Sequence, residues 1–196
     1  MADFWTRYRR NRAAVLGLGI LLTILIMAAT AHLFYPEDPF RLVGRPLSGP
    51  LENGFLLGSD SLGRDVASGI VHGAKTSLLI GLIATLVSIF IGIFFGAFAG
   101  YFGGRIDDLL MRITEIFQTI PSFIFAILLV AIMKPSIVSI VIAIAVVSWP
   151  GVARLVRGEF LSLKSREFVQ ACHTLGMSDL RAVSYTHLTL PTIRLV

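Results

Sequence analysis

Long apolar stretches alternate with polar segments along this chain. They run over residues 13–31, 76–104, 113–133 and 135–153, and charged residues gather in the segments between them. Each stretch approaches or exceeds the roughly 20 apolar residues that an α-helix needs to cross the hydrocarbon core of a bilayer. In the third stretch we expect Pro121 to kink the helix, because proline lacks the backbone N–H of a helical residue. The pattern therefore predicts four transmembrane helices.

The composition narrows the class of protein. Hydrophobic residues make up 55% of the chain and charged residues 15%, a balance far from that of soluble domains. In lipid the backbone must satisfy its own hydrogen bonds, which leaves helices or a closed barrel, and these stretches are too long for barrel strands. We therefore expect an all-α membrane protein of one domain.

Charge and cysteine content exclude other classes. The net charge of +5 could suggest nucleic-acid binding, but the basic residues flank apolar stretches instead of forming a stripe between aromatic residues. We expect the lipid bilayer as a partner and no nucleic acid. Cys172 is the one cysteine, which excludes an internal disulfide and a zinc site built on cysteines, and we expect no metal site.

The N-terminal residues predict the orientation of the first helix. Arginine occupies positions 7, 9, 10 and 12 against a single acid, Asp3, which places this end in the cytoplasm by the positive-inside rule. A secretory signal peptide is the alternative, since Ala29-Thr30-Ala31 resembles a cleavage site. The apolar stretch is longer than the roughly 7 to 15 residues of a signal sequence. We expect residues 1–34 to form a cytoplasmic N-terminus and an uncleaved first helix.

Residues 35–72 are polar and rich in proline and glycine, which predicts an external loop. Within it, residues 56–70 read LLGSDSLGRDVASGI, and their glycine, aspartate and arginine residues could form turns and a local Asp–Arg ion pair. The following stretch carries small residues three or four positions apart, which predicts close helix packing in the membrane. These are Gly81, Ala84, Ser88, Gly92, Gly96 and Gly100. A glycine-rich turn and residues DDLLMR come next, and we assign them to the cytoplasmic side.

The segment of residues 159–179 is the one long polar insertion after the apolar stretches. Ser165 suits a helix N-cap, Glu167 lies in the first turn, and Gly176 suits a left-handed C-terminal position. Apolar residues at helical spacing, such as Phe168 and Cys172, would give this short helix one apolar face. We therefore expect an amphipathic helix that docks on a partner.

Four strings in the sequence carry a resemblance to a known family, the permease subunits of the dipeptide, oligopeptide and nickel class of bacterial ABC importers. The family's L-G-T-D-x-x-G-R-D is matched by Gly58, Asp60, Gly63, Arg64 and Asp65, with Ser59 in place of threonine. Its G-Y-x-G-G-x-x-D-x-x-x-M-R is matched by Gly100, Tyr101, Gly103, Gly104, Asp107, Met111 and Arg112, and its W-x-x-x-A-R-x-x-R by Trp149, Ala153, Arg154 and Arg157. Its E-A-A-x-x-x-G loop resembles Gln170, Ala171, Cys172 and Gly176, with Gln170 in place of glutamate and Cys172 in place of the second alanine.

The resemblance implies an inner-membrane permease subunit with an incomplete form of the family's six-helix fold. Residues 73–181 would form a partial permease core, and a coupling loop at residues 154–181 would seat Glu167 and the Gln170–Gly176 region on an ATP-hydrolysing subunit. The implied partners are a second permease subunit, two ATP-binding subunits and a periplasmic or lipid-anchored solute-binding protein. The chain itself would be no enzyme and hold no cofactor, because ATP and magnesium would bind the partner subunits. Consistent with this, no Walker-type glycine-lysine loop occurs in the sequence.

Two other classes of protein fit this pattern less well. A self-contained secondary transporter or channel is expected to carry ionisable groups near the bilayer midplane, and Glu115, which lies near the end of its stretch, is the one acid inside an apolar stretch. Glu115 is therefore expected to be solvated. An intramembrane enzyme would need His, Asp and Cys at one depth, which the stretches do not offer. Peptides, nickel and related small solutes all remain open as cargo.

The resemblance ends near residue 181. The family's I-x-L-P should follow nine residues after Gly176, but Thr186 replaces the isoleucine, and Pro191 falls two places late. The family's two further membrane helices are also missing. We therefore expect residues 182–196 to be an aberrant tail on a C-terminally truncated chain.

Overall fold

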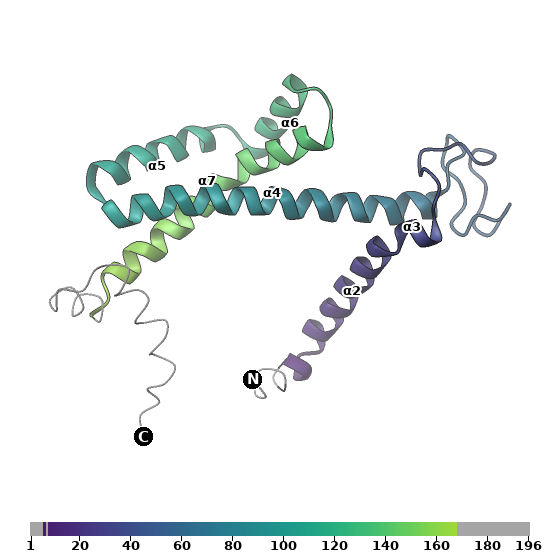
Figure 1. Ribbon diagram of the computed structural model, residues 1–196, viewed down its shortest axis with the longest axis horizontal. Coiled ribbons are helices and arrows are strands. Elements are labelled where there is room, and N and C mark those ends of the chain that lie inside the picture. Colours follow the sequence, from purple (N-terminus) through teal and green to yellow (C-terminus); the bar gives the residue numbers. More distant parts are fainter. Residues whose placement is uncertain (1–5, 7, 168–196) are drawn as a thin grey trace. The chain divides into compact units, whose positions relative to one another are not determined.

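The computed structural model describes residues 6 and 8–167, and all its regular elements are helices. They are α2 (Arg12–Ala29), α3 (Ala31–Phe34), α4 (Val66–Phe102), α5 (Gly104–Thr119), α6 (Ser122–Ile132) and α7 (Ile137–Lys164) (Figure 1). In the described residues the only β-type pairing is an isolated bridge between Ser59 and Asp65. The expected all-α fold is confirmed. The predictions for Gln170, Ala171, Cys172, Gly176 and the tail of residues 182–196 lie outside the described residues.

Three helices are long and apolar enough to cross a membrane, namely α2, α4 and α7. The third predicted helix is not continuous, because α5 and α6 are bent by 81° where they meet. Ile120 is extended (φ −89°, ψ 130°) and Pro121 follows with ψ 128°. A proline forces the preceding residue out of the helical region and removes a backbone donor, so it ends the helix here instead of only kinking it. The bent pair makes a fourth span if it is counted as one.

The chain divides into two compact units, Met1–Gly81 and Leu82–Val196, which are described separately. In the first unit, the Asn11 side chain accepts a hydrogen bond from the backbone N–H of Ala14 and caps α2. The imidazole Nε2 of His72 lies 2.9 Å from the carbonyl oxygen of Tyr35, so the chain just after α3 is fixed to the second turn of α4. The loop between α3 and α4 therefore has both ends anchored.

Helix α4 begins at Val66, ten residues before the apolar stretch of residues 76–104, so the last part of the predicted loop of residues 35–72 is helical. The carboxylate of Asp65 accepts a hydrogen bond from the backbone N–H of Ala67 at 2.9 Å and satisfies an otherwise unpaired donor of the first turn. The 37 residues of α4 span about 55 Å at 1.5 Å per residue, well beyond the roughly 30 Å of hydrocarbon.

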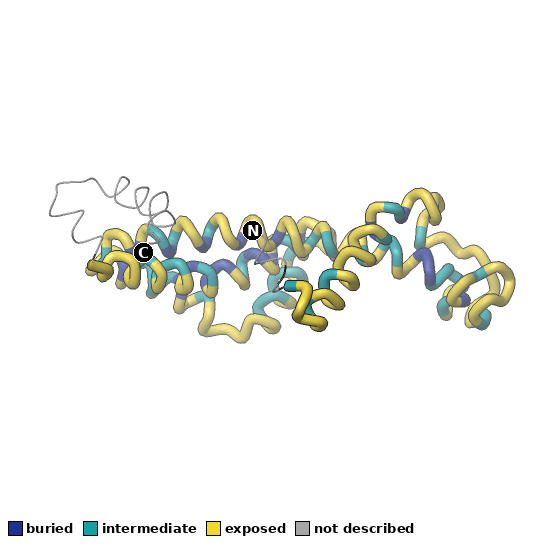
Figure 2. The backbone as a smooth tube through the Cα atoms, turned by 90° about the horizontal axis from the view of Figure 1, so that it is seen from below, coloured by how far each residue is buried: buried dark blue, intermediate teal, exposed yellow. Residues whose placement is uncertain are grey.

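In the second unit the end of α4 lies in close contact with α7. A Cβ added at Gly92 would lie 2.5 Å from the Cβ of Val152, and one at Gly100 would lie 2.5 Å from the Cβ of Phe160. A Cβ at Gly96 would overlap the carbonyl oxygen of Ala153. Figure 2 shows the buried positions along this part of the chain. The predicted packing role of the small residues is confirmed here, whereas Gly81 meets nothing within 4 Å.

Trp149 is buried among the aromatic rings of this unit. It is 4% exposed, and its ring centroid lies 4.7 Å from that of Phe95 on α4 and 5.3 Å from that of Phe117 on α5. Burial of the indole against these rings stabilises the fold more than its exposure at a polar surface would. Helix α7 also continues past Pro150 to Lys164, beyond the predicted end at residue 153.

Candidate functional site

The external string of residues 58–65 is ordered by its own backbone. The Asp60 carboxylate accepts hydrogen bonds from the backbone N–H groups of Leu62 and Arg64, both at 2.8 Å. The N–H of Arg64 is the main cause that holds the pKa of Asp60 below its ordinary value. These bonds stabilise the ionised carboxylate and close the turn.

The expected ion pair between Asp60 or Asp65 and Arg64 is absent from the described residues, so that prediction is wrong. The guanidinium carbon of Arg64 lies 5.5 Å from the centre of the Phe40 ring, in a cation–π arrangement. Asp60 and Asp65 each use an oxygen on a backbone N–H instead. Arg64 therefore stabilises the loop through stacking.

Gly58 and Gly63 are required by the loop path. Their φ angles are 81° and 78°, and a Cβ would overlap the carbonyl oxygen of Ser48 at the first and of Gly44 at the second. Ser59 is buried, and its hydroxyl donates to the carbonyl oxygen of Arg45 at 2.5 Å. A threonine has the same hydroxyl, so Ser59 keeps the hydrogen-bonding group found in the motif it resembles.

A second cluster of predicted residues meets at the far end of α4 and α7. Residues Gly103 and Gly104 form the turn between α4 and α5, with φ angles of 64° and 53°. Asp107, 7% exposed, receives two hydrogen bonds from Arg157: Nε to Oδ1 at 2.5 Å and Nη2 to Oδ2 at 2.6 Å. This bidentate geometry is the strongest form of a carboxylate–guanidinium contact. It fixes the first turn of α5 to α7 across 50 positions of sequence.

Lys164 adds a second connection that the sequence did not predict. Its ammonium group donates to the carbonyl oxygen of Tyr101 at 3.1 Å, so the last turn of α7 is fixed to the last turn of α4. A lysine that comes 63 positions after its backbone acceptor leaves no signal in the sequence. We call Tyr101, Asp107, Arg157 and Lys164 the junction.

A polar hollow of about 720 Å³ lies beside the junction and is lined by Asp108, Met111, Arg112, Glu115, Arg154 and Arg157. Two motif arginines, Arg112 and Arg154, are exposed there. Glu115 is also exposed. Pro121 and Trp149 lie apart from this hollow, in the break between α5 and α6 and in the aromatic core. Glu167, the last described residue, is exposed a few residues beyond α7.

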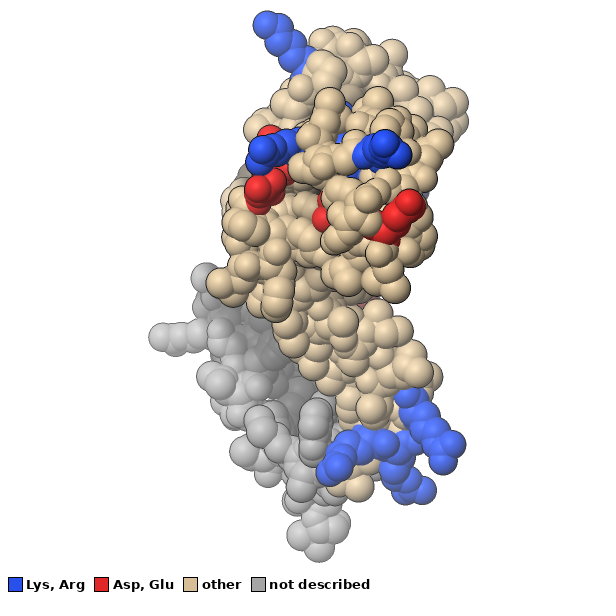
Figure 3. Space-filling model, turned by 90° about the vertical axis from the view of Figure 1, so that its right-hand side faces the viewer, with Lys and Arg blue, Asp and Glu red and all other residues tan. Residues whose placement is uncertain are grey.

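Charged side chains are distributed unevenly over the first unit. Figure 3 shows side chains of both signs over the loop, and basic side chains at the other end of that unit. Arg9, Arg10 and Arg12 are exposed and precede the apolar part of α2.

Comparisons with known proteins agree with these features. The family described as "Binding-protein-dependent transport system inner membrane component" matches residues 92–196, and "N-terminal TM domain of oligopeptide transport permease C" matches residues 1–48. The chain is similar to the dipeptide transport system permease protein DppC of Bacillus subtilis, with 38% identity over 92% of the chain and 57% of the relative. It is 41% identical to the oligopeptide transport system permease protein OppC of Escherichia coli, over 90% of the chain and 59% of the relative.

A third relative is the glutathione transport system permease protein GsiD of Salmonella typhimurium, 37% identical over 97% of the chain and 63% of the relative. The chain thus spans about three fifths of the length of the curated relatives it matches. With more than half of its residues matched, the chain belongs to the family of binding-protein-dependent transport system inner membrane components.

Proposed function

We propose that this chain is a permease subunit of an ATP-driven importer for peptides or related small solutes, with nickel a further candidate. The observation that carries the proposal is the junction, in which Arg157 and Lys164, in the first part of the predicted coupling loop of residues 154–181, join α7 to α5 and α4. The names of the relatives mention dipeptides, oligopeptides or glutathione as transported solutes, which supports a peptide-like solute for this chain.

The proposed site of action is the bacterial inner membrane, with the N-terminus in the cytoplasm. Support comes from the exposed arginines before α2 and from the mixed charge of the loop at the other end of the first unit (Figure 3). Cytoplasmic segments carry an excess of Arg and Lys, whereas external loops do not. The loop of residues 35–65 would then face outward.

The junction suggests how movement of the coupling loop reaches the membrane helices. Arg157 and Lys164 connect the end of α7 to α5 and α4, so a displacement of the chain after Lys164 is carried to both helices together. Paired charges and packed helices transmit such shifts because they have few alternative arrangements. The coupling loop, with Glu167, Gln170, Ala171, Cys172 and Gly176, would contact an ATP-binding subunit.

The full assembly would contain a second permease subunit, two ATP-binding subunits and a periplasmic or lipid-anchored solute-binding protein. ATP and magnesium would bind the ATP-binding subunits, so this chain would hold no cofactor and catalyse no reaction. Its part is to supply the pore wall and to convert ATP-driven movement into access for the solute.

The test is reconstitution of the chain with the ATP-binding, permease and solute-binding proteins encoded beside it. We expect the chain to co-purify with the ATP-binding subunit, and we expect a dipeptide-loaded binding protein to raise ATP hydrolysis in proteoliposomes. The alternative, a self-contained secondary transporter or channel, predicts solute uptake by the chain alone under an ion gradient. Uptake of that kind without ATP-binding subunits would overturn the proposal.

A further inference from the structure

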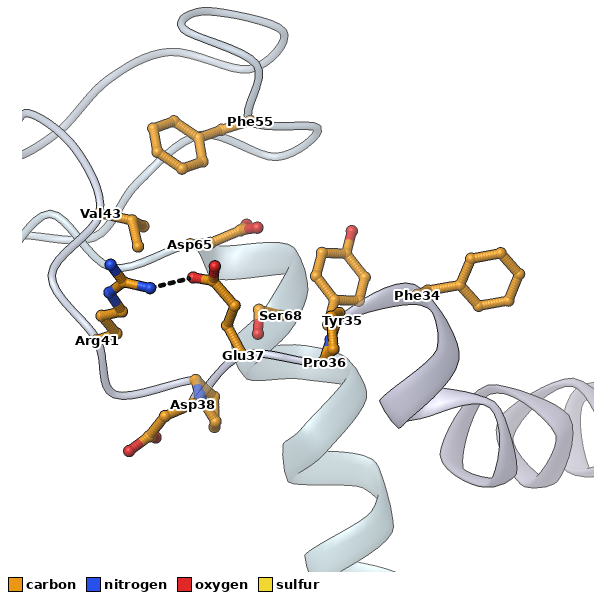
Figure 4. Close-up of a pocket in the computed structure, with 11 residues that line it drawn as sticks. Phe34, Tyr35, Pro36, Glu37, Asp38, Arg41, Val43, Phe55, Asp65 and Ser68 are labelled. Carbon is orange, nitrogen blue, oxygen red and sulfur yellow. Dashed lines mark hydrogen bonds and ion pairs between the residues drawn. The ribbon is translucent and has the colours of Figure 1, made fainter.

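A hollow of about 340 Å³ lies in the first unit, where the loop meets the start of α4 (Figure 4). Its size falls within the range of about 300–1,000 Å³ typical of small-molecule sites. Phe55 and Tyr35 supply aromatic walls, and Asp65, Glu37 and Ser68 supply polar groups. None of these residues belongs to the junction.

Two polar groups in this hollow have capacity for a ligand. Asp65 uses Oδ1 to accept from the N–H of Ala67, and Oδ2 has no hydrogen bond or ion pair within the described residues. Ser68 is only 7% exposed, and its hydroxyl makes no hydrogen bond in the same part of the chain. A polar group bound in the hollow would find the Ser68 hydroxyl available as a donor or acceptor.

The electrostatic field in the hollow favours a cation. Burial and the nearby Asp65 carboxylate together raise the pKa of the Tyr35 phenol, because both disfavour a second negative charge. The same field stabilises a positive group. Glu37 also lines the hollow and is paired with Arg41 at 3.0 Å. The carboxylate of Asp38 points away from the hollow in Figure 4 and accepts a hydrogen bond from the N–H of Phe40.

We propose that this hollow binds the ammonium end of a small zwitterionic solute of dipeptide size. An ammonium group has three donors, and Asp65, Ser68 and the Glu37 carboxylate offer three acceptors around one space. The aromatic faces of Tyr35 and Phe55 add cation–π attraction. A lone metal ion fits less well, because the described residues hold no group of three metal-ligating side chains.

Arg41 decides in favour of a zwitterion over a simple amine. Its side chain and that of Glu37 are 63% and 61% exposed, so the pair between them is weak and can be exchanged. The carboxylate of the solute pairs with the guanidinium of Arg41. The ammonium group at its other end pairs with the carboxylates of Glu37 and Asp65. Short peptides carry both groups, and this choice of solute rests on the proposed function. The site would then be an external one, reached before the membrane is crossed.

The test is saturation-transfer NMR on the full chain in nanodiscs, with L-alanyl-L-alanine as the observed probe. We expect Asp65→Asn, which keeps the helix cap, to raise the dissociation constant about three- to fivefold, the range for an exposed ion pair. Ser68→Ala should weaken binding in the same direction. The matched control is Glu52→Gln, which removes a carboxylate from the same loop outside the hollow and should leave binding unchanged.

Probes with one charge blocked identify which end is bound. N-acetyl-alanyl-alanine should bind at least about fivefold more weakly than the free dipeptide, and alanyl-alanine amide should also bind more weakly through loss of the contact with Arg41. Equal binding of the acetylated probe, or no effect of Asp65→Asn in a variant with parental helix content, would overturn the proposal. Stronger binding of Nα-acetyl-lysine methylamide than of the dipeptide would also overturn it, in favour of a docked lysine side chain. Because binding is measured on the isolated chain, failed ATP-driven uptake would leave this result standing.

Discussion

Removal of the Asp107–Arg157 ion pair tests whether the junction stabilises the second unit. The two side chains are 11% and 35% exposed, which places the pair between a surface salt bridge and a buried one. Exposed pairs contribute about 0.2–1 kcal/mol, whereas loss of one partner of a buried pair costs about 3–5 kcal/mol. Because the exposure of this pair lies between those two cases, we expect Asp107→Asn and Arg157→Gln each to lower the free energy of unfolding by about 2 kcal/mol.

The assay is a double-mutant cycle, with unfolding of the chain by sodium dodecyl sulfate in mixed micelles followed by circular dichroism. If the side chains stabilise each other, the double variant should lose about 1–2 kcal/mol less than the sum of the single losses. Arg154→Gln is the matched control, because Arg154 lies on α7 one turn before Arg157 and has no ion pair among the described residues. Its effect should stay within about 0.5 kcal/mol.

Additive losses in the cycle would refute the argument, since they would show that the two groups stabilise the fold independently. Equal losses for Arg154→Gln and Arg157→Gln would also refute the argument, because they would show that loss of any positive charge from this part of α7 lowers the stability. Arg157→Lys should lose less stability than Arg157→Gln but remain less stable than the parent chain, because an ammonium group cannot make the bidentate contact.

The remaining predictions concern packing, pH and topology. Gly96→Leu should destabilise the second unit by about 3 kcal/mol, because the leucine side chain has no room against α7. Gly81→Leu should have little effect on stability, and the same detergent unfolding assay compares the two variants. The lowered pKa of Asp60 means that its contribution is complete above the ordinary value of 3.8 and is lost as the pH falls through the lower folded value. Amide hydrogen exchange at Leu62 should therefore accelerate only below that pH, and Asp60→Asn should remove the dependence. Cysteine labelling at Ser61, which is exposed where Ser59 is buried, should succeed from outside only, and labelling from the cytoplasm alone would exclude the proposed orientation.

Several local features could have been predicted better from the sequence than they were. Asp65 directly precedes the first helical residues, Val66 and Ala67. Aspartate is a typical N-cap residue, so the sequence does indicate that α4 begins at this point. Pro121 correctly marked a disturbance in the third apolar stretch. The sequence could not give the angle of 81°, because nothing local sets the direction in which α6 leaves a broken helix.

The partners of charged and aromatic side chains depended on tertiary structure. Aspartate and arginine four positions apart suggested an ion pair in the loop, yet the Asp60 carboxylate was taken by backbone N–H groups and Arg64 stacked on Phe40. The choice depends on which loop segments come close, and Phe40 is 24 positions away in sequence from Arg64 (64 less 40). Trp149 was likewise placed by Phe95 and Phe117, which arrive from two other helices.

By itself the sequence determined that the chain is helical, that it is a membrane protein, and which strings link it to its family. Length and uninterrupted hydrophobicity decide these points because a spanning backbone in lipid has no partner other than itself. The glycine spacing on α4 also predicted a close contact, but not its partner. Only the tertiary structure decided that α7 fills that contact, that Asp107 meets Arg157, and that Asp65 and Ser68 face one hollow. These features join residues far apart in sequence or on neighbouring turns, so they exist only once the helices and the loop have packed.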